Sequence, residues 1–288
     1  MIKKYLIRII GALCILGAMA VLFMPGSIRL DGIKRRDLRI MRNDLRGQYA
    51  AGMDNTISFA NQDEFQDELR DCGFPHTKAK LKARSKEVTG IINELFDGSV
   101  SMKELLTVSC KAPGFIEEMQ NLLDSDYCSR VFFHGAAYYA LTEGSQANYR
   151  PGEHVESSKV TKHAEKFEKI TQDAIDEASE YTFVFSLLAG FLILLIVLAA
   201  ASAATHICNK GRWLKYVLLA ILVILVIGLC VALPVASDIL AEQTDMAMAL
   251  EDLTLEITAA PFIAIALLLV PMVLDIIFER KRKPATKG

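Results

Sequence analysis

Four long apolar runs dominate the hydrophobic pattern of this chain. They cover residues 5–24, 182–205, 214–235 and 259–278. At ~1.5 Å rise per residue, a helix of about 20 residues crosses a hydrocarbon core of ~30 Å. No charged residue lies between Glu180 and His206. The same holds between Lys215 and Asp238, so neither run would offer water a polar face in a soluble core. We therefore predict four membrane-spanning helices.

The first run has a second interpretation, because two lysines ahead of an apolar stretch also describe a secretory signal peptide. Ala18 and Ala20 offer a small-x-small cleavage site. However, the apolar run continues through residues 21–23, which leaves no polar region before the cut. We favour an uncleaved transmembrane anchor over residues 1–26.

Between the first and second runs, the pattern changes to the spacing of amphipathic helices, with an apolar residue every third or fourth position. A first segment shows it at Leu38, Met41, Leu45, Tyr49, Met53 and Ile57. A second segment shows it at Val160, Ala164, Phe167, Ile170, Ala174, Ala178 and Tyr181. No Pro or Gly separates Lys159 from Leu188, so the second segment is predicted to continue into the membrane as one long helix. We expect it to pack beside the first segment as a membrane-proximal stalk.

Shorter helices are predicted between these two segments, separated by Gly, Pro and Asp. They cover residues 78–96, 102–109, 115–123 and 127–141. Little of the chain alternates with a period of two, so strands are expected to be a minority. The predicted fold class is an all-α membrane protein with four transmembrane helices. A mostly helical extracytoplasmic domain, residues 27–181, is inserted between the first two, and residues 182–288 form a three-helix membrane domain.

Composition and charge support membrane insertion and suggest its direction. Of the 288 residues, 52% are hydrophobic, and the mean hydropathy of +0.29 is high for a soluble protein. The loop 206–215 and the tail after Phe278 are basic, whereas the loop between the third and fourth runs has acids and no Lys or Arg. The positive-inside rule then predicts a protein of the cell membrane with both termini cytoplasmic and residues 27–181 outside.

A basic stretch close behind the first run opposes this orientation. Reversing the chain would place the acidic loop inside and the basic tail outside, which is the larger violation. Residues 27–181 carry 21 basic and 26 acidic side chains, a net charge of −5, so the domain is not a basic surface for nucleic acid. Arg35, Arg39 and Arg42 have two interpretations. They form a solvated helix face, or a candidate interaction surface for anionic headgroups or wall polymers.

Aromatic residues gather at Phe132, Phe133, Tyr138 and Tyr139. Packing in the core is the first interpretation of this group. A ligand or partner groove is the second, because aromatic side chains contribute strongly to binding energy. We therefore include the four residues in the candidate interaction surface.

Three cysteines fall in the predicted outer domain, which permits one disulfide and one leftover thiol. A bond between Cys110 and Cys128 would close a loop of ~18 residues and contribute about 3 kcal/mol in the chain-entropy model. Reduced, buried cysteines are the alternative. The sequence has no H-E-x-x-H, G-x-S-x-G, P-loop, dinucleotide fingerprint or C-x-x-C. We therefore predict a protein that is not an enzyme and has no metal or cofactor.

Two charged residues fall inside the predicted spans. Arg8 lies four residues beyond Lys4, and Asp275 lies four residues before Glu279, so each is ~6 Å into the inner leaflet. Opposite charges at equal depth predict an intramembrane ion pair between the first and fourth helices. The alternative is that each side chain snorkels independently to the headgroups.

The leading functional hypothesis is a non-enzymatic protein of the cell envelope. Its outer helical domain would bind a ligand or a protein partner, or a second copy of the chain, as a sensor, adaptor or scaffold, with the lipid bilayer around its spans. The one-plus-three layout is similar to that of permease subunits of the cell-division and macrolide-export type. This resemblance implies the alternative, a transporter-associated permease subunit that works with a separate ATPase.

Overall fold

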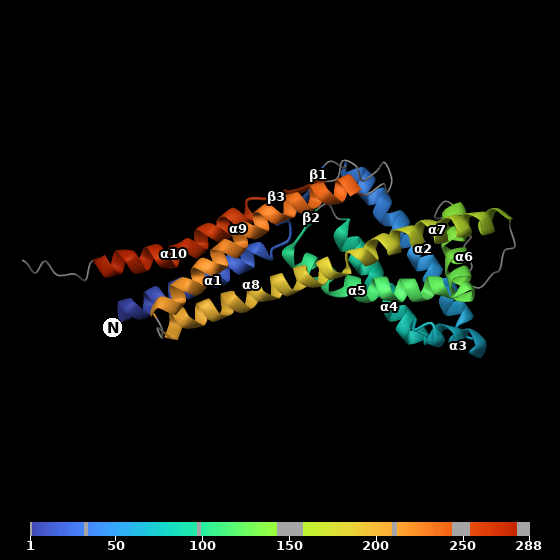
Figure 1. Cartoon of the computed structure of the whole chain (residues 1–288), viewed down its shortest axis with the longest axis horizontal. Coiled ribbons are helices and arrows are strands. Elements are labelled where there is room, and N and C mark those ends of the chain that lie inside the picture. The colour runs from blue at the N-terminus through green and yellow to red at the C-terminus, as the bar shows by residue number, and fades with distance from the viewer. Residues whose placement is uncertain are drawn as a thin grey trace, which may run out of the picture. The chain divides into compact units, whose positions relative to one another are not determined.

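The structure, a computed structural model, describes residues 2–31, 34–96, 99–142, 158–208, 212–243 and 254–280 (Figure 1). The helices are α1 (Ile2–Leu22), α2 (Arg35–Phe59), α3 (Asp63–Asp71), α4 (Lys78–Leu95), α5 (Met102–Asp124), α6 (Asp126–Leu141), α7 (Ser158–Glu180), α8 (Thr182–Cys208), α9 (Arg212–Gln243) and α10 (Ala260–Arg280). The strands are β1 (Ile28–Asp31), β2 (Ser99–Val100) and β3 (Thr254–Ile257). The described part of the chain is therefore almost entirely helical, in agreement with the predicted all-α class.

Two compact units make up the chain. The membrane unit contains Met1–Ile33, Ser99–Leu106 and Leu188–Gly288. The helical unit contains Lys34–Gly98 and Thr107–Leu187. The segment Ser99–Leu106, which the sequence analysis assigned to the outer domain, thus belongs to the unit that holds most of the apolar helices.

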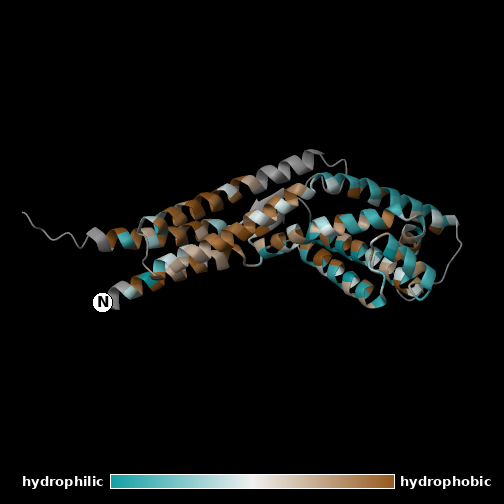
Figure 2. Cartoon of the chain, turned by 60° about the horizontal axis from the view of Figure 1, so that its bottom comes forward, coloured by the Kyte–Doolittle hydropathy of each residue, from teal (hydrophilic) through white to brown (hydrophobic). Residues whose placement is uncertain are grey.

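Among the residues that the structure describes, four helices are long and apolar enough to cross a membrane, in agreement with the predicted number. They are Tyr5–Leu22, Thr182–Cys208, Trp213–Ala232 and Ala260–Ile277. Figure 2 shows hydrophobic residues along these helices and hydrophilic residues spread over the helical unit. Large apolar side chains such as Leu13 and Ile224 are 61% and 66% exposed, which is the arrangement expected of helices whose outer faces contact lipid.

Small residues bring the helices of the membrane unit close together. The helix α1 packs along α10, and α10 packs along α9. At Gly11, an added Cβ would lie 3.2 Å from His206 Cδ2 and 3.5 Å from Pro271 Cβ, so the His206 ring would have to shift by a few tenths of an ångström to accept it. The residues Leu192, Leu195, Ala199 and Ala203 bring α8 into the same core.

A small antiparallel sheet in the order β2-β1-β3 joins three distant parts of the membrane unit. Ile28 of β1 lies opposite Val100 of β2 and Ile257 of β3. The Ser27 carbonyl accepts a hydrogen bond of 2.8 Å from Thr258 Oγ1. These strands have two to four residues each, too few for alternation to be visible in the sequence.

The helix α6 is the centre of the helical unit. Both α2 and α7 pack against α6, while α4 packs against α2 and α3 contacts α6. The predicted stalk of α2 beside α7 is therefore wrong, because each of these helices packs on α6 and not along the other. The seven consecutive residues 131–137 of α6 are all buried. A helix that is buried on every side needs neighbours on more than one side.

Glycines and one asparagine allow α2 and α6 to approach closely. A Cβ added at Gly135 would lie 2.7 Å from the Ala51 carbonyl oxygen, and one added at Gly52 would lie 2.8 Å from the Phe132 ring. Between the same helices, Asn55 Nδ2 donates a buried hydrogen bond of 2.7 Å to the Val131 carbonyl. The contact is thus fixed by both shape and a polar link.

Two helix boundaries differ from the predicted ones. The long helix expected from Lys159 onward is divided at Tyr181, whose N–H bonds to Ala178 three residues back. The residues that follow, Thr182–Val184, are β-branched or aromatic and therefore weak helix formers. Conversely, α5 continues through Pro113, because a proline removes a single hydrogen bond and its helix neighbours hold the remaining turns.

Candidate functional site: an apolar cavity with a charged network

A cavity of about 500 Å³ lies within the helical unit, between α2, α4, α5, α6 and α7. Aliphatic and aromatic side chains form most of its wall. They include Leu45, Tyr49, Val88, Ile91, Ile92, Leu95, Val108, Phe115, Met119, Phe132, Phe133, Phe167, Ile170 and Ile175. A volume in the range of ~300 to 1,000 Å³ with a mainly apolar wall is typical of small-molecule sites.

Helical spacing explains why these side chains converge. On α4 the wall residues Arg84, Val88 and Ile91 follow one another at intervals of four and three. On α5, Lys111 and Phe115 have an interval of four. Each set therefore lies on one helix face, and the two faces meet across the cavity wall.

Aromatic rings in mutual contact form one side of the cavity. The Tyr49 ring centroid lies 5.7 Å from that of Phe132 and 6.3 Å from that of Phe115, both in tilted or edge-on geometry. Phe132 and Phe133 are 5.2 Å apart, edge to face. Burial raises the pKa of Tyr49 well above its usual range, so its hydroxyl stays protonated at physiological pH.

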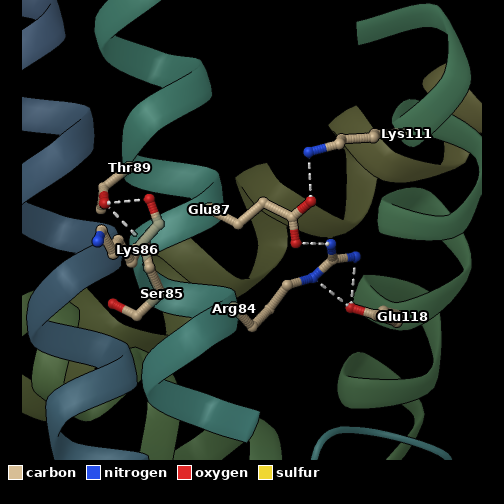
Figure 3. A network of polar contacts seen from close by, with 7 residues as sticks. All are labelled: Arg84, Ser85, Lys86, Glu87, Thr89, Lys111 and Glu118. Atoms are coloured by element: carbon tan, nitrogen blue, oxygen red, sulfur yellow. Dashed lines mark hydrogen bonds and ion pairs between the residues drawn. The ribbon is translucent and has the colours of Figure 1, made fainter. Parts of the chain in front are cut away.

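A network of four charged side chains borders the apolar wall (Figure 3). Arg84 Nε donates to Glu118 Oε2 at 2.7 Å, and a terminal guanidinium nitrogen lies 2.9 Å from Glu87 Oε2. The second oxygen of Glu87 accepts from Lys111 Nζ at 2.6 Å. The Arg84 guanidinium also lies 5.9 Å from the centre of the Phe115 ring. Two cations and two carboxylates thus give this border no net charge.

Partial burial holds the network in place. The side chain of Arg84 is 14% exposed, while those of Glu87 and Glu118 are about one-third exposed. Hydrogen bonds from Lys111 and then Arg84 hold the pKa of Glu87 below its ordinary value. The carboxylate is therefore ionised at neutral pH and remains paired with both cations.

The predicted aromatic surface is part of this cavity rather than an exposed face. Phe132 and Phe133 are 4% and 3% exposed and line the cavity, so core packing, the first interpretation of this pair, is confirmed. Tyr138 is half-buried against the same core. Tyr139 covers Gly47, where an added Cβ would overlap its ring. Because both rings line the cavity, the second interpretation, a ligand or partner groove, stays a prediction.

The arginines of the same prediction lie elsewhere. Arg35 and Arg39 are exposed in the first turns of α2, and Arg42 is half-buried. Arg35 precedes Gly47, which Tyr139 covers, by about 18 Å along the helix axis. The seven residues therefore do not form one surface, and a role of the arginines at anionic headgroups or wall polymers stays a prediction.

The predicted disulfide between Cys110 and Cys128 is also wrong. Cys110 is exposed on α5, whereas Cys128 is fully buried on α6, and both are free thiols. The chain-entropy model takes the chain between the two cysteines as flexible. Because α5 is continuous from Cys110 to its end at Asp124, Cys110 lies about 21 Å along the helix axis from that end, close to which α6 and Cys128 begin. The thiol in contact with Cys128 is instead that of Cys72.

Asp275 forms an ion pair with a residue other than the one predicted. It binds Lys215, and Tyr216 Oη donates to it at 3.1 Å. Arg8 lies instead with its guanidinium 5.9 Å from the centre of the Tyr5 ring. The physical reason is that Lys215 belongs to the first turns of α9, which packs on α10, and not to the preceding loop. The predicted contact between the first and fourth spans does occur, between α1 and α10.

The charged network was missed by sequence reasoning, although a signal for it exists. Arg84, Glu87, Lys111 and Glu118 occupy the same helix faces as apolar wall residues, which sets them apart from ordinary surface charges. The partner of each charge could not be assigned, because it depends on how α4 and α5 pack.

Among the residues that the structure describes, no group of three His, Cys, Asp or Glu side chains is placed to hold a metal ion. Comparison of the chain with known protein families, with curated proteins and with solved structures finds no match. The functional argument therefore rests on the geometry of the site itself.

Proposed function

We propose that this chain is a non-enzymatic multi-pass membrane protein whose helical unit binds an apolar ligand in the cavity, as a sensor or adaptor. The observation that carries this proposal is the cavity of about 500 Å³ with its mainly apolar wall. Protein interiors are normally close-packed, so a mainly apolar recess of this size leaves wall side chains without packing partners. A bound apolar molecule would supply the missing contacts.

The border of the cavity suggests the polar end of the ligand. Arg84 and Lys111 are the cations there, and Glu87 and Glu118 already bind both of them. An anionic headgroup would have to displace a carboxylate, and a cationic one would face two cations. The matching ligand is an uncharged amphiphile, with a hydrocarbon body and a hydroxyl or ester group that hydrogen-bonds at the border.

Charge distribution supports an extracytoplasmic position for the helical unit. The chain is basic between α8 and α9 and after α10, and acidic between α9 and α10. The positive-inside rule places the basic segments in the cytoplasm, so the helical unit would meet its ligand on the outer side of the cell membrane.

Photo-crosslinking tests the proposal on the full-length protein in lipid nanodiscs. A monoacylglycerol with a diazirine in its acyl chain serves as the probe, and the modified peptides are identified by mass spectrometry. We expect labels on peptides of α4, α5 and α6 that line the cavity, in addition to those from the lipid-facing spans. Excess unlabelled monoacylglycerol should suppress the cavity labels and leave the span labels.

A matched pair of variants separates the cavity from general lipid contact. Ala112→Phe places a ring inside the cavity wall, whereas Ala83→Phe makes the same change at an exposed position on α4. Cavity labelling should fall at least tenfold in Ala112→Phe and stay unchanged in Ala83→Phe, with equal helical content by circular dichroism. Labels confined to the spans, or equal labelling in both folded variants, would reject the proposal.

A further inference from the structure

Two thiols from different helices meet inside the helical unit, away from the apolar cavity. Cys72 ends α3, and Cys128 lies in the first turn of α6, which α3 contacts. The Cys128 thiol hydrogen-bonds to the Cys72 sulfur. Cys72 Sγ in turn lies 3.4 Å from the Leu69 carbonyl oxygen, as a donor to it. The two sulfur atoms are therefore neighbours with no residue between them.

The two thiols differ in their access to solvent. Cys128 is 0% exposed and belongs to the core of the helical unit. Cys72 is half-buried and forms part of the wall of a polar surface depression, together with Asn121 and Ser125. A reagent from solution can therefore reach Cys72 directly and Cys128 only through Cys72.

The hydrogen bond also makes the thiols unequal as nucleophiles. It lowers the pKa of Cys72 to about 7 and raises the pKa of Cys128. A substantial fraction of Cys72 is thus thiolate at neutral pH, and the thiolate is the form that attacks disulfides.

We propose that Cys72 and Cys128 form a reversible thiol–disulfide exchange site, with Cys72 as the attacking thiol and Cys128 as the resolving thiol. The oxidant is a disulfide, RSSR. The Cys72 thiolate attacks one sulfur of RSSR. A bond forms between Cys72 Sγ and that sulfur, the S–S bond of RSSR breaks, and RS⁻ leaves. Cys128 Sγ then attacks Cys72 Sγ, the mixed disulfide breaks, and the second RS⁻ leaves with the Cys128 proton. Two electrons pass from the cysteine pair to RSSR, which becomes two thiols.

The surroundings of Cys72 select the charge of the reacting disulfide. Four carboxylates line the same depression: Glu68, Asp71, Asp124 and Asp126. Their field repels an anionic disulfide and attracts a cationic one at low ionic strength. The natural reaction partner is therefore a disulfide or dithiol flanked by basic groups.

The test uses the reduced full-length protein in detergent at pH 7. Cystamine, a dicationic disulfide, and glutathione disulfide, an anionic one, are the two oxidants, and peptide mapping by mass spectrometry reads the products. We expect a linked Cys72–Cys128 peptide with both oxidants, formed at least tenfold faster with cystamine after normalisation to the modification rate of exposed Cys110. This preference should shrink as salt is raised to about 1 M.

Three variants assign the roles. Cys128→Ser should stop at the mixed disulfide on Cys72, Cys72→Ser should leave Cys128 unmodified, and Cys110→Ser should behave as the wild type. The rate of Cys72 alkylation in Cys128→Ala should shift to higher pH, since the hydrogen bond donated by Cys128 is lost, whereas the serine hydroxyl of Cys128→Ser can still donate. Dithiothreitol should restore both thiols while the circular dichroism spectrum stays unchanged.

Several outcomes would overturn the proposal. No linked peptide in the folded protein, or a linked peptide that forms or reduces only in denaturant, excludes reversible exchange. A linked peptide involving Cys110 would show that the thiols are paired differently. Equal normalised rates for the two oxidants would show that the carboxylates around Cys72 do not select a cationic disulfide.

Discussion

Glu87 connects the charged network of the cavity, because its two carboxylate oxygens bind different cations. One oxygen accepts from Arg84 and the other from Lys111. These hydrogen bonds hold the pKa of Glu87 below its ordinary value. The folded state therefore favours the charged carboxylate more than the unfolded state does. The resulting stabilisation is fully present above the ordinary pKa, and is lost as pH falls through the lower pKa of the folded state.

A pH-dependent loss of stability follows for Glu87→Gln. We expect this variant to be about 1 kcal/mol less stable than the wild type at pH 7, a value reduced from that of a buried charged hydrogen bond because the carboxylate is partly exposed. As pH falls below the ordinary glutamate pKa of about 4.3, the difference should shrink, because the wild-type carboxylate is then increasingly protonated. Thermal unfolding of the full-length protein, followed by circular dichroism between pH 3 and 7, measures it.

Glu94→Gln is the matched control, because Glu94 is an exposed carboxylate on the same helix. Its effect should stay within about 0.5 kcal/mol at every pH. If Glu87→Gln keeps the whole pH dependence of the wild type, the paired carboxylate is not the source of acid sensitivity.

At the scale of helices, the sequence is a good guide wherever one physical requirement decides the pattern. The bilayer fixes the length and apolarity of a span, so the four runs were identifiable. Likewise, the adjacent apolar residues Phe132 and Phe133 correctly indicated a buried helix face. Features set by tertiary packing were not predictable. Pro113 stays inside α5, and β1 finds partners far away in the chain, because neighbouring elements outweigh local preference.

The candidate site shows the same limit. Its aromatic members were singled out in the sequence, as core packing or as a ligand or partner groove, but the cavity that they line was not predicted. A cavity is the volume that side chains from five helices leave unfilled, so no local pattern records it. The predicted disulfide and the predicted ion pair failed for a related reason. The observed partners, Cys72 with Cys128 and Lys215 with Asp275, depend on which helices are neighbours.

The contact between α2 and α6 predicts unequal effects of adding one methyl group. Gly135→Ala should destabilise the helical unit by about 1 to 3 kcal/mol, because the new Cβ meets a backbone oxygen, which cannot rotate away. Gly90→Ala on α4 is the matched control, with nothing within 4 Å of the new Cβ. It should stabilise by about 0.5 to 1 kcal/mol through helix propensity. Chemical denaturation of both variants measures the difference, and similar effects would contradict the close approach.

The helices α9 and α10 are joined by a buried ion pair, which predicts strong coupling between its partners. The side chains of Lys215 and Asp275 are 10% and 19% exposed. Lys215→Ala should cost about 3 to 5 kcal/mol in detergent, because it leaves Asp275 charged and unpaired. The double variant Lys215→Met with Asp275→Leu should be much closer to the wild type, as both buried charges are removed together.

Arg8→Ala provides the contrast, since Arg8 contacts the Tyr5 ring and Asp275 already has a partner. We expect a loss below about 1 kcal/mol. Additive losses from Lys215→Ala and Asp275→Ala in a double-mutant cycle would show that the pair does not couple α9 to α10.

At the scale of the whole molecule, the two units differ in the solvent their surfaces suit. The membrane unit exposes apolar side chains such as Ile224, whereas the helical unit exposes charged ones such as Arg35 and Arg39. A cavity in the unit with charged surface side chains and four apolar helices in the other agree with the proposed binding of a ligand beside a membrane. The side of the membrane then decides which ligands and oxidants are available, so orientation is the property on which both proposals depend.

Two native cysteines allow the orientation to be measured without new sites. Cys110 is exposed in the helical unit, and Cys208 is exposed at the end of α8, next to the basic segment predicted to be cytoplasmic. The charge rule therefore predicts that a membrane-impermeant maleimide labels Cys110 in intact cells and Cys208 only after permeabilisation. Cys110→Ser and Cys208→Ser assign each label, and Cys72→Ser removes the contribution of the half-buried thiol. Labelling of Cys208 in intact cells, with Cys110 protected until lysis, would reverse the orientation and place the cavity in the cytoplasm.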